Sequence, residues 1–116
     1  MSRTWSLLFL SLMLTGCATH RVPLYTWGHY EGQIYTSYSE PGKLSQQQQI
    51  EELEQDYQKA RASNKRMHPG FHAQLGYLYF QTGKLDQARQ EFATEKAEFP
   101  ESAVLMDRLT ANLAKK

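Results

Sequence analysis

The pattern that most constrains the fold is a pair of amphipathic segments joined by a glycine turn, between Pro69 and Ser102. Apolar residues of the first segment follow the i, i+4, i+7, i+8 spacing of one helix face, at Phe71, Leu75, Leu78 and Tyr79. Thr82-Gly83 ends this helix, because glycine readily takes the left-handed conformation that closes many helices. The second segment stops at Pro100 and carries an apolar face of Leu85, Ala88, Phe92 and Phe99. The pattern therefore predicts a helical hairpin.

The span from Pro69 to Ser102 is 34 residues, the period of the tetratricopeptide repeat, and the hairpin resembles one such repeat. The positions that carry the resemblance are Leu75, Gly76, Tyr79, Ala88, Phe92 and Pro100. Small residues at two of them, Gly76 and Ala88, let the paired helices approach closely. The hairpin departs from the repeat at His72, where Trp is frequent, and at Glu95, where Ala is usual. We expect His72 to pack, and Glu95 to face solvent or to pair with a basic neighbour.

One repeat cannot bury both of its faces, so flanking helices must supply the missing layers. Ser45 and Gln48 match a capping box and predict a helix over 45–63, followed by a loop over 64–68. Pro69 suits the first position of the next helix. Ser102 is placed to cap a last helix whose apolar face is Val104, Leu105, Leu109 and Leu113. The predicted fold class is all-α, a short helical bundle with one tetratricopeptide-like hairpin and flanking helices.

Residues 25–42 form an aromatic segment that ends in the breaker Glu40-Pro41-Gly42. Its aromatic side chains are Tyr25, Trp27, Tyr30, Tyr35 and Tyr38, and their spacing predicts a short helix over about 29–39. The segment holds more tyrosine than a small core requires, and Tyr and Trp dominate interface hot spots. We therefore expect these five side chains to contact a protein partner. Core packing is the alternative, and it has equal weight for Trp27.

The N-terminus has the pattern of a secretory signal that ends at the single cysteine of the chain. Arg3 precedes a mostly apolar stretch, Trp5 to Leu14, which is shorter than the roughly 20 apolar residues that span a bilayer. Leu14-Thr15-Gly16-Cys17 resembles a bacterial lipobox, which implies cleavage before Cys17 and attachment of acyl chains such as palmitate. The alternative is a cysteine that merely ends an ordinary signal peptide. Ala18, in place of Asp, favours the periplasmic side of the outer membrane.

These boundaries divide the chain into a removed signal peptide (1–16), a lipidated tether (17–24), the aromatic segment (25–42) and a helical domain (43–116). The 116 residues carry a formal net charge of +1, which gives no strong electrostatic case for nucleic acid or an anionic membrane surface. Loss of Arg3 with the signal leaves twelve basic and twelve acidic side chains. One cysteine also excludes a disulfide framework and a four-cysteine zinc site.

The sequence contains few groups of residues that could form a catalytic site. Cys17 is committed to lipidation, and the chain has neither a glycine-rich phosphate loop nor a Gly-x-Ser-x-Gly motif. His68 and His72 are four residues apart, but Pro69 lies between them, so we expect no metal site. His29 is expected to pack in a loop rather than to form a ligand cage. The sequence thus favours a protein that is not an enzyme and has no catalytic residues, cofactor or small-molecule substrate.

The whole chain resembles a family of small bacterial lipoproteins of unknown function with a tetratricopeptide-like C-terminal half. The resemblance rests on the lipobox, on Tyr25-Thr26-Trp27-Gly28-His29-Tyr30-Glu31, and on the segments 75–78 and 95–102. It implies a place beside a homologue of the curli secretion channel and a further small lipoprotein. A second group, tetratricopeptide lipoproteins that activate a peptidoglycan synthase from the outer membrane, is similar in general design.

We therefore expect an outer-membrane-anchored, periplasm-facing adaptor or accessory subunit that binds envelope proteins. The alternative function is activation of a peptidoglycan synthase, which a rate measurement on the synthase would distinguish from passive binding. A third hypothesis is a purely structural lipoprotein that associates with itself.

Overall fold

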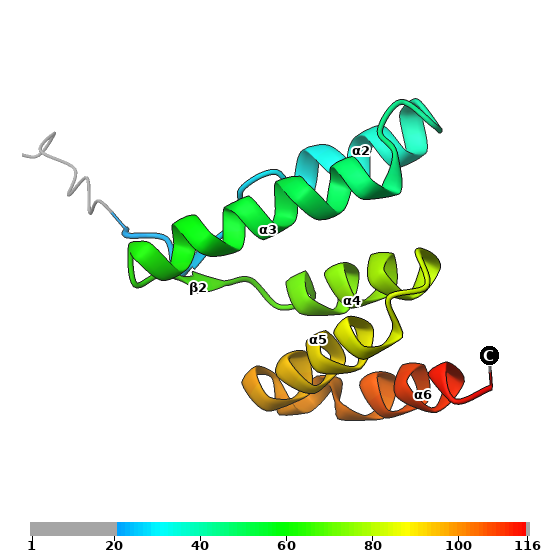
Figure 1. Cartoon of the computed structure of the whole chain (residues 1–116). Helices are drawn as coiled ribbons and strands as arrows, with labels where there is room; N and C mark the ends of the chain where they lie inside the picture. Colours follow the sequence, from blue (N-terminus) through cyan, green and yellow to red (C-terminus); the bar gives the residue numbers. More distant parts are fainter. Residues whose placement is uncertain (1–20, 116) are drawn as a thin grey trace, which may run out of the picture.

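A computed structural model describes residues 21–115, and these residues form α-helices and two very short strands. Along the chain the elements are β1 (Tyr25–Thr26), α2 (Tyr30–Ser39), α3 (Gln46–Ala62), β2 (Arg66–Met67), α4 (Phe71–Gln81), α5 (Leu85–Glu98), the 3₁₀ helix η1 (Pro100–Ser102) and α6 (Ala103–Leu113) (Figure 1). The predicted all-α fold class is confirmed. None of the described helices is long and apolar enough to cross a membrane. The signal peptide and Cys17 lie outside the described residues.

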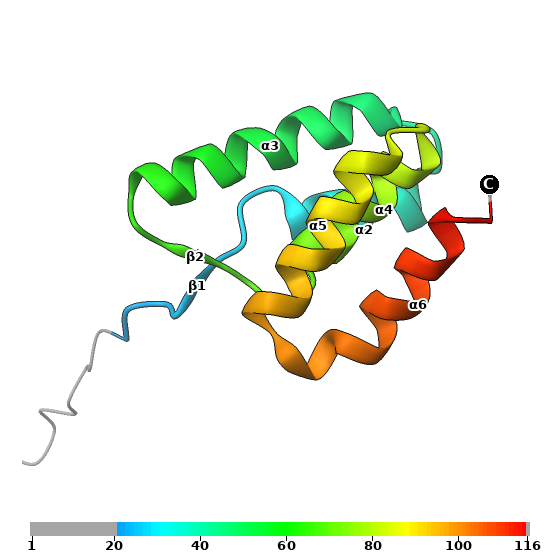
Figure 2. The ribbon, with the colours of Figure 1, turned by 60° about the horizontal axis from the view of Figure 1, so that its bottom comes forward.

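The helices pack as a bundle in which α4 contacts α3, α5 contacts α4, and α6 contacts α5 (Figures 1 and 2). Their buried apolar side chains form one core, which includes Ile50, Leu53, Phe71, Leu75, Phe92 and Met106. Helix α2 is held to α3 through Gln33, whose side-chain amide donates to the Gln49 carbonyl at 3.1 Å and to the Glu52 carboxylate at 2.8 Å. The short helix predicted in the aromatic segment is confirmed, and it belongs to this bundle.

Helices α4 and α5 form the predicted hairpin, and Gly76 sets how closely they approach. A Cβ atom on Gly76 would lie 2.7 Å from Cε1 and 2.8 Å from Cδ1 of Phe92, which is closer than van der Waals contact allows. Ala88 is fully buried, and Gly83 closes the turn with a φ of +78°. The predicted packing positions of the hairpin are buried, namely Leu75, Gly76, Tyr79, Ala88 and Phe92.

The capping box predicted at the start of α3 is confirmed. The Ser45 hydroxyl accepts from the Gln48 backbone amide at 3.1 Å, and the Gln48 side-chain oxygen accepts from the Ser45 amide at 2.9 Å. This exchange satisfies two amides that the first helical turn leaves without intrahelical partners.

The predicted start of α4 at Pro69 is wrong by two residues. Gly70 has a φ of +91°, a left-handed conformation that separates Pro69 from the helix, so α4 begins at Phe71. Ser102 does not cap α6 either, because its hydroxyl donates to the Phe99 carbonyl at 2.7 Å within the preceding turn.

The predicted apolar face of α6 is only partly correct. Leu113 is buried and Leu109 is partly buried, but Val104 and Leu105 are 67% and 57% exposed. The buried residue of this turn is Met106, because α5 covers α6 on the Met106 side. Val104 and Leu105 therefore form an uncovered apolar pair on the surface.

The sequence did not predict the two strands. Tyr25 lies opposite Arg66 and Thr26 opposite Met67, and the two strands are parallel. Two residues are too few to show the alternation by which a strand is recognised. This pairing fixes the beginning of the aromatic segment against the connection between α3 and α4.

Candidate functional site

Three of the five aromatic side chains of residues 25–42 pack onto the bundle. The Trp27 ring stacks on the His68 ring, with centroids 4.0 Å apart and planes 4° from parallel, and the Tyr30 ring lies 4.2 Å from His68. Tyr25 meets Phe99 edge-to-face at 6.0 Å. Trp27 nevertheless remains 43% exposed, so it packs on one face and is open to solvent elsewhere.

His68 is the centre of this aromatic cluster, and its side chain is fully buried. Burial lowers the pKa of His68 from its ordinary value of 6.5, and the hydrogen bond to the Pro69 carbonyl only partly opposes this effect. The Nδ1–H group donates to that carbonyl at 2.8 Å, while the buried Nε2 atom has no hydrogen-bond partner in the protein. His68 therefore acts as a neutral, flat packing surface for Trp27.

Gly28 and His29 fasten the same segment to α3. Gly28 has a φ of +51°, and a Cβ atom there would collide with the carboxylate of Asp56. The close approach lets the His29 amide donate to Asp56 Oδ2 at 2.6 Å, while His29 Nδ1 pairs with Oδ1 at 2.9 Å. His29, which we expected to pack in a loop, has a side chain that is 52% exposed, and it is fixed by its hydrogen bonds to the buried Asp56.

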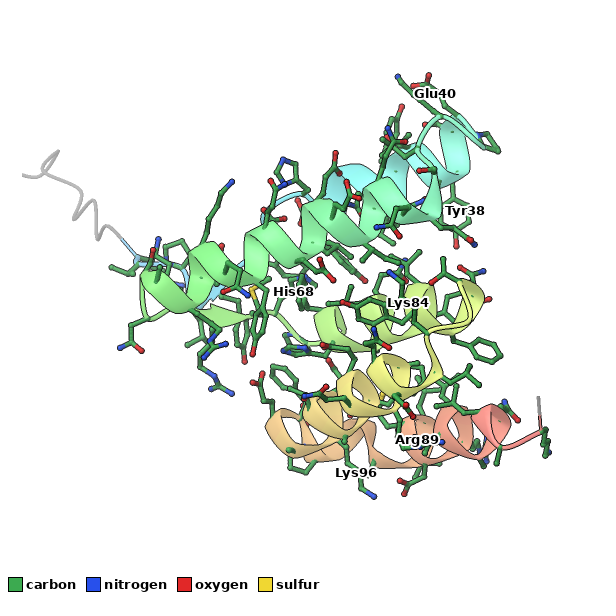
Figure 3. All side chains as sticks on the ribbon, in the orientation of Figure 1. Tyr38, Glu40, His68, Lys84, Arg89 and Lys96 are labelled. Carbon is green, nitrogen blue, oxygen red and sulfur yellow. The ribbon has the colours of Figure 1, made fainter. Side chains whose placement is uncertain are left out.

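The other two aromatic residues, Tyr35 and Tyr38 on α2, are 72% and 85% exposed. Tyr38 lines a groove of 270 Å³ between α2 and α4, together with the half-exposed Tyr77. No lining residue is charged; the full set is Ile34, Ser37, Tyr38, Gln46, Gln49, Gln74, Tyr77, Leu78 and Gln81. Figure 3 shows that this end of α2 lies far from β1 and from the C-terminal end of α3. We call Tyr35, Tyr38, Tyr77 and this groove the aromatic end.

A larger groove of 760 Å³ lies between α3 and the hairpin. It is lined by Glu51, Glu54, Gln55, Tyr57, Gln58, Lys59, Leu75, Tyr79 and Glu91. The Tyr79 hydroxyl donates to the Glu54 carboxylate across this groove. Burial, and then Glu54 itself, raise the pKa of Tyr79, so the hydroxyl stays protonated and remains a donor at neutral pH.

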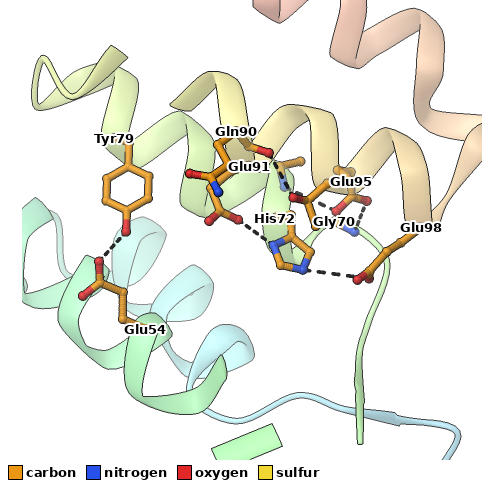
Figure 4. Close-up of polar contacts among 10 residues, drawn as sticks. Glu54, Gly70, His72, Tyr79, Gln90, Glu91, Glu95 and Glu98 are labelled. Atoms are coloured by element: carbon orange, nitrogen blue, oxygen red, sulfur yellow. Dashed lines mark hydrogen bonds and ion pairs between the residues drawn. The ribbon is translucent and has the colours of Figure 1, made fainter. Parts of the chain in front are cut away.

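The two departures from the repeat pattern are explained by buried hydrogen bonds (Figure 4). Glu95 is buried, and its carboxylate accepts from the Gly70 amide at 2.7 Å and from the Ala73 amide at 3.4 Å. The prediction that Glu95 faces solvent or pairs with a base is therefore wrong. The carboxylate satisfies free amides at the start of α4, where the helix dipole also favours negative charge. His72 packs as predicted, with Nδ1 2.6 Å from the Glu91 carboxylate.

Each of these polar groups links one element of the fold to another. Within residues 21–115, no three His, Cys, Asp or Glu side chains are grouped so that they could hold a metal ion. The two grooves and the exposed aromatic side chains are open to a ligand.

Most of the residues that form these helices and grooves are matched by the model of one protein family. The family model described as "Domain of unknown function (DUF4810)" matches residues 24–109. The chain belongs to this family. The match runs from the start of the aromatic segment into α6, so the family domain contains both the aromatic end and the hairpin. No curated protein and no solved structure matches the chain. The predicted membership in a family of unknown function is confirmed.

Sequence reasoning missed two residues around these sites. Tyr77 does not belong to the apolar face of α4 that the helical period defines. Its position on the helix therefore indicated that it would be exposed. Asp56 gave no such signal, because its partner His29 is 27 residues away and a carboxylate on a helix is ordinarily solvated.

Proposed function

We propose that this protein is an outer-membrane-anchored, periplasm-facing lipoprotein that acts as a protein-binding adaptor or accessory subunit of an envelope assembly. The lipobox at Leu14 to Cys17 supports the anchor. One observation above all supports the binding role. Tyr38 and Tyr77 line an uncharged groove in a small helical domain, and Tyr35 on the same helix as Tyr38 exposes further aromatic surface.

The composition of the aromatic end is that of an interface centre. Aromatic residues are enriched and charged residues are depleted at the core of protein interfaces. Tyrosine combines a large apolar ring with a hydroxyl that can find a hydrogen-bond partner, and it is enriched among hot-spot residues. The four glutamines of the groove supply donors and acceptors around the rings.

Within this proposal, the α4–α5 hairpin is a single tetratricopeptide-like repeat whose open faces are covered by α3 and α6. The support is the buried set of Leu75, Tyr79, Ala88 and Phe92, and the close approach at Gly76. The partner we favour is another envelope protein, such as a homologue of the curli secretion channel, because the sequence resemblance implies that neighbour.

The proposal is tested by capture from crosslinked, detergent-solubilised envelopes with two matched variants. Tyr35→Ser/Tyr38→Ser removes exposed apolar surface from the aromatic end, whereas Val104→Ser/Leu105→Ser removes it from α6. We expect the wild type and the α6 variant to retain the same discrete partner, and the tyrosine variant to lose it. No stable partner for the wild type, or equal recovery with both variants, would contradict the proposed site.

A further inference from the structure

Basic side chains gather at one end of the molecule. Lys59 and Arg61 are on the last turns of α3, Lys65 and Arg66 follow directly, and Arg21 is at the beginning of the described chain; all five are exposed. Because β1 pairs with β2, the N-terminal segment reaches the bundle beside Arg66 (Figures 1 and 2). The sequence from 57 to 85 contains no Asp or Glu. We call these five residues the basic end.

The positive charges of the basic end are not neutralised within the described residues. None of the five takes part in an ion pair there, whereas Lys43, Arg89 and Lys96 each pair with a carboxylate. Arg61 instead lies over the Tyr57 ring at 5.8 Å, and Arg66 lies 5.9 Å from the Tyr25 ring and 5.8 Å from the Phe99 ring. Contact with a ring leaves the full charge available to an anionic partner.

Exposed apolar side chains accompany this charge. Val22 and Leu24 are 80% and 71% exposed in the segment that leads into β1. Exposed apolar groups beside Lys and Arg are typical of protein surfaces that bind the interface of an anionic membrane. The overall charge of +1 conceals this feature, because the acidic side chains of α3 precede its basic ones: Glu51, Glu52 and Glu54 lie in its first half, and Asp56, the last, is buried.

The proposed lipid anchor would hold the basic end close to a membrane. Cys17 is eight residues before Tyr25, and a fully extended chain reaches at most about 3.6 Å per residue, or roughly 29 Å in all. Electrostatic attraction decays over about 8 Å at physiological salt, so a tether of this reach allows the basic end to enter the field of the headgroups.

We propose that the basic end docks on anionic phospholipid headgroups and orients the domain on the membrane. Arg21, Lys59, Arg61, Lys65 and Arg66 supply the charge, and Val22 and Leu24 supply the apolar contact. Docking in this orientation directs the aromatic end away from the lipid, because the two ends lie at opposite ends of α3 (Figure 3). The orienting role rests on the proposed anchor at Cys17, whereas the affinity for anionic lipid does not.

The test uses the full chain, expressed with its own signal, on vesicles of phosphatidylcholine alone or with one third phosphatidylglycerol. Trp27 is the only tryptophan of residues 17–116, so energy transfer from it to a headgroup-linked acceptor reports how close this end lies to the lipid. We expect the transfer to be larger on the anionic vesicles and to fall to the neutral-vesicle value in high salt, because salt screens the attraction.

Two triple variants with the same change of charge complete the design. Lys59→Gln/Arg61→Gln/Lys65→Gln should abolish the increase caused by anionic lipid. Lys84→Gln/Arg89→Gln/Lys96→Gln alters cations of the hairpin region, away from β1, and should preserve that increase (Figure 3). Equal transfer on the two kinds of vesicle, or equal loss in both variants, would overturn the proposal.

Flotation of the same samples separates this proposal from the anchor. An anchored chain floats with neutral vesicles, so failure to float there would count against the anchor alone. A chain without an anchor should still float with anionic vesicles at low salt, and on the order of 100-fold more weakly once three cations are removed. An unanchored chain that does not float with anionic vesicles at low salt would contradict the proposed affinity of the basic end for anionic lipid.

Discussion

Glu95 shows how a residue that departs from the tetratricopeptide sequence pattern can stabilise the fold. Its buried carboxylate accepts from the amides of Gly70 and Ala73, so that a side chain of α5 caps the start of α4. The repeat pattern predicts Ala at this position, and Gly70 is 25 residues away, so no local signal marks the contact. The left-handed Gly70 explains the need for it, because that residue has no side chain with which to cap the helix.

The Glu95→Ala substitution should lower the free energy of unfolding by about 2 kcal/mol, because it leaves buried amides without an acceptor. Urea denaturation of the purified chain measures this loss. Glu101→Ala, at an exposed position, is the control and should change stability little. Equal effects of the two substitutions would show that the Glu95 carboxylate does not cap α4.

The stability of the fold should fall as the pH drops below about 6.5, with His68 as a main cause. Burial lowers the pKa of His68 in the folded chain, so between the two pKa values the unfolded chain binds a proton that the folded chain does not. The contribution of His68 is therefore full above the unfolded pKa, and it is lost as the pH falls toward the folded pKa. Denaturation at pH 7.5 and pH 5 should show a smaller decline for His68→Phe than for the wild type. The same decline in both proteins would exclude His68 as the titrating group.

At the scale of elements, the sequence predicts the helices well, because their signals are local. It does not predict the contacts between residues that are distant in the chain. The period of Phe71, Leu75 and Leu78 and the capping box at Ser45 are local signals, and both elements formed as expected. The pairing of β1 with β2 joins residues 41 positions apart, and each strand is too short to carry a pattern. Val104 and Leu105 are exposed because the packing of α5 selects one face of α6, which periodicity in α6 alone does not determine.

Substituting glycine by alanine should have opposite effects on stability in α4, which belongs to the hairpin, and in α2. Gly76→Ala would force a Cβ atom against the Phe92 ring and should lower stability by about 1–3 kcal/mol. Gly32→Ala in α2 meets no atom within 4 Å and should raise stability by about 0.5–1 kcal/mol, because alanine favours the helix. Thermal unfolding of both variants measures this difference. A neutral or stabilising effect at Gly76 would show that α4 and α5 do not approach as described.

At the scale of the whole molecule, the aromatic side chains divide between two roles that the sequence did not separate. Tyr25, Trp27 and Tyr30 hold the N-terminal segment on the bundle, while Tyr35 and Tyr38 stay exposed at the other end. The sequence could mark all five as candidates by type. The division depends on His68 and Phe99, which are distant in the chain, and so it required the folded arrangement.

The proposed anchor gives a prediction for the whole molecule. A Cys17→Ser variant has no thiol for acylation, so it should lose labelling by a palmitate analogue and, in high salt, should no longer fractionate with the outer membrane. Metabolic labelling followed by membrane fractionation measures both effects. Unchanged labelling in the variant would contradict the lipobox assignment, while partial membrane retention at low salt would agree with docking by the basic end.

The central claim, a partner bound at the aromatic end, is tested most directly by site-specific photocrosslinking in intact cells. A photoreactive phenylalanine analogue replaces Tyr38 in one strain and the exposed Gln90 of α5 in another. We expect a discrete crosslinked species from position 38 that is absent from position 90, and the same partner in the capture experiment. No crosslink at position 38, or the same species from both positions, would contradict the claim.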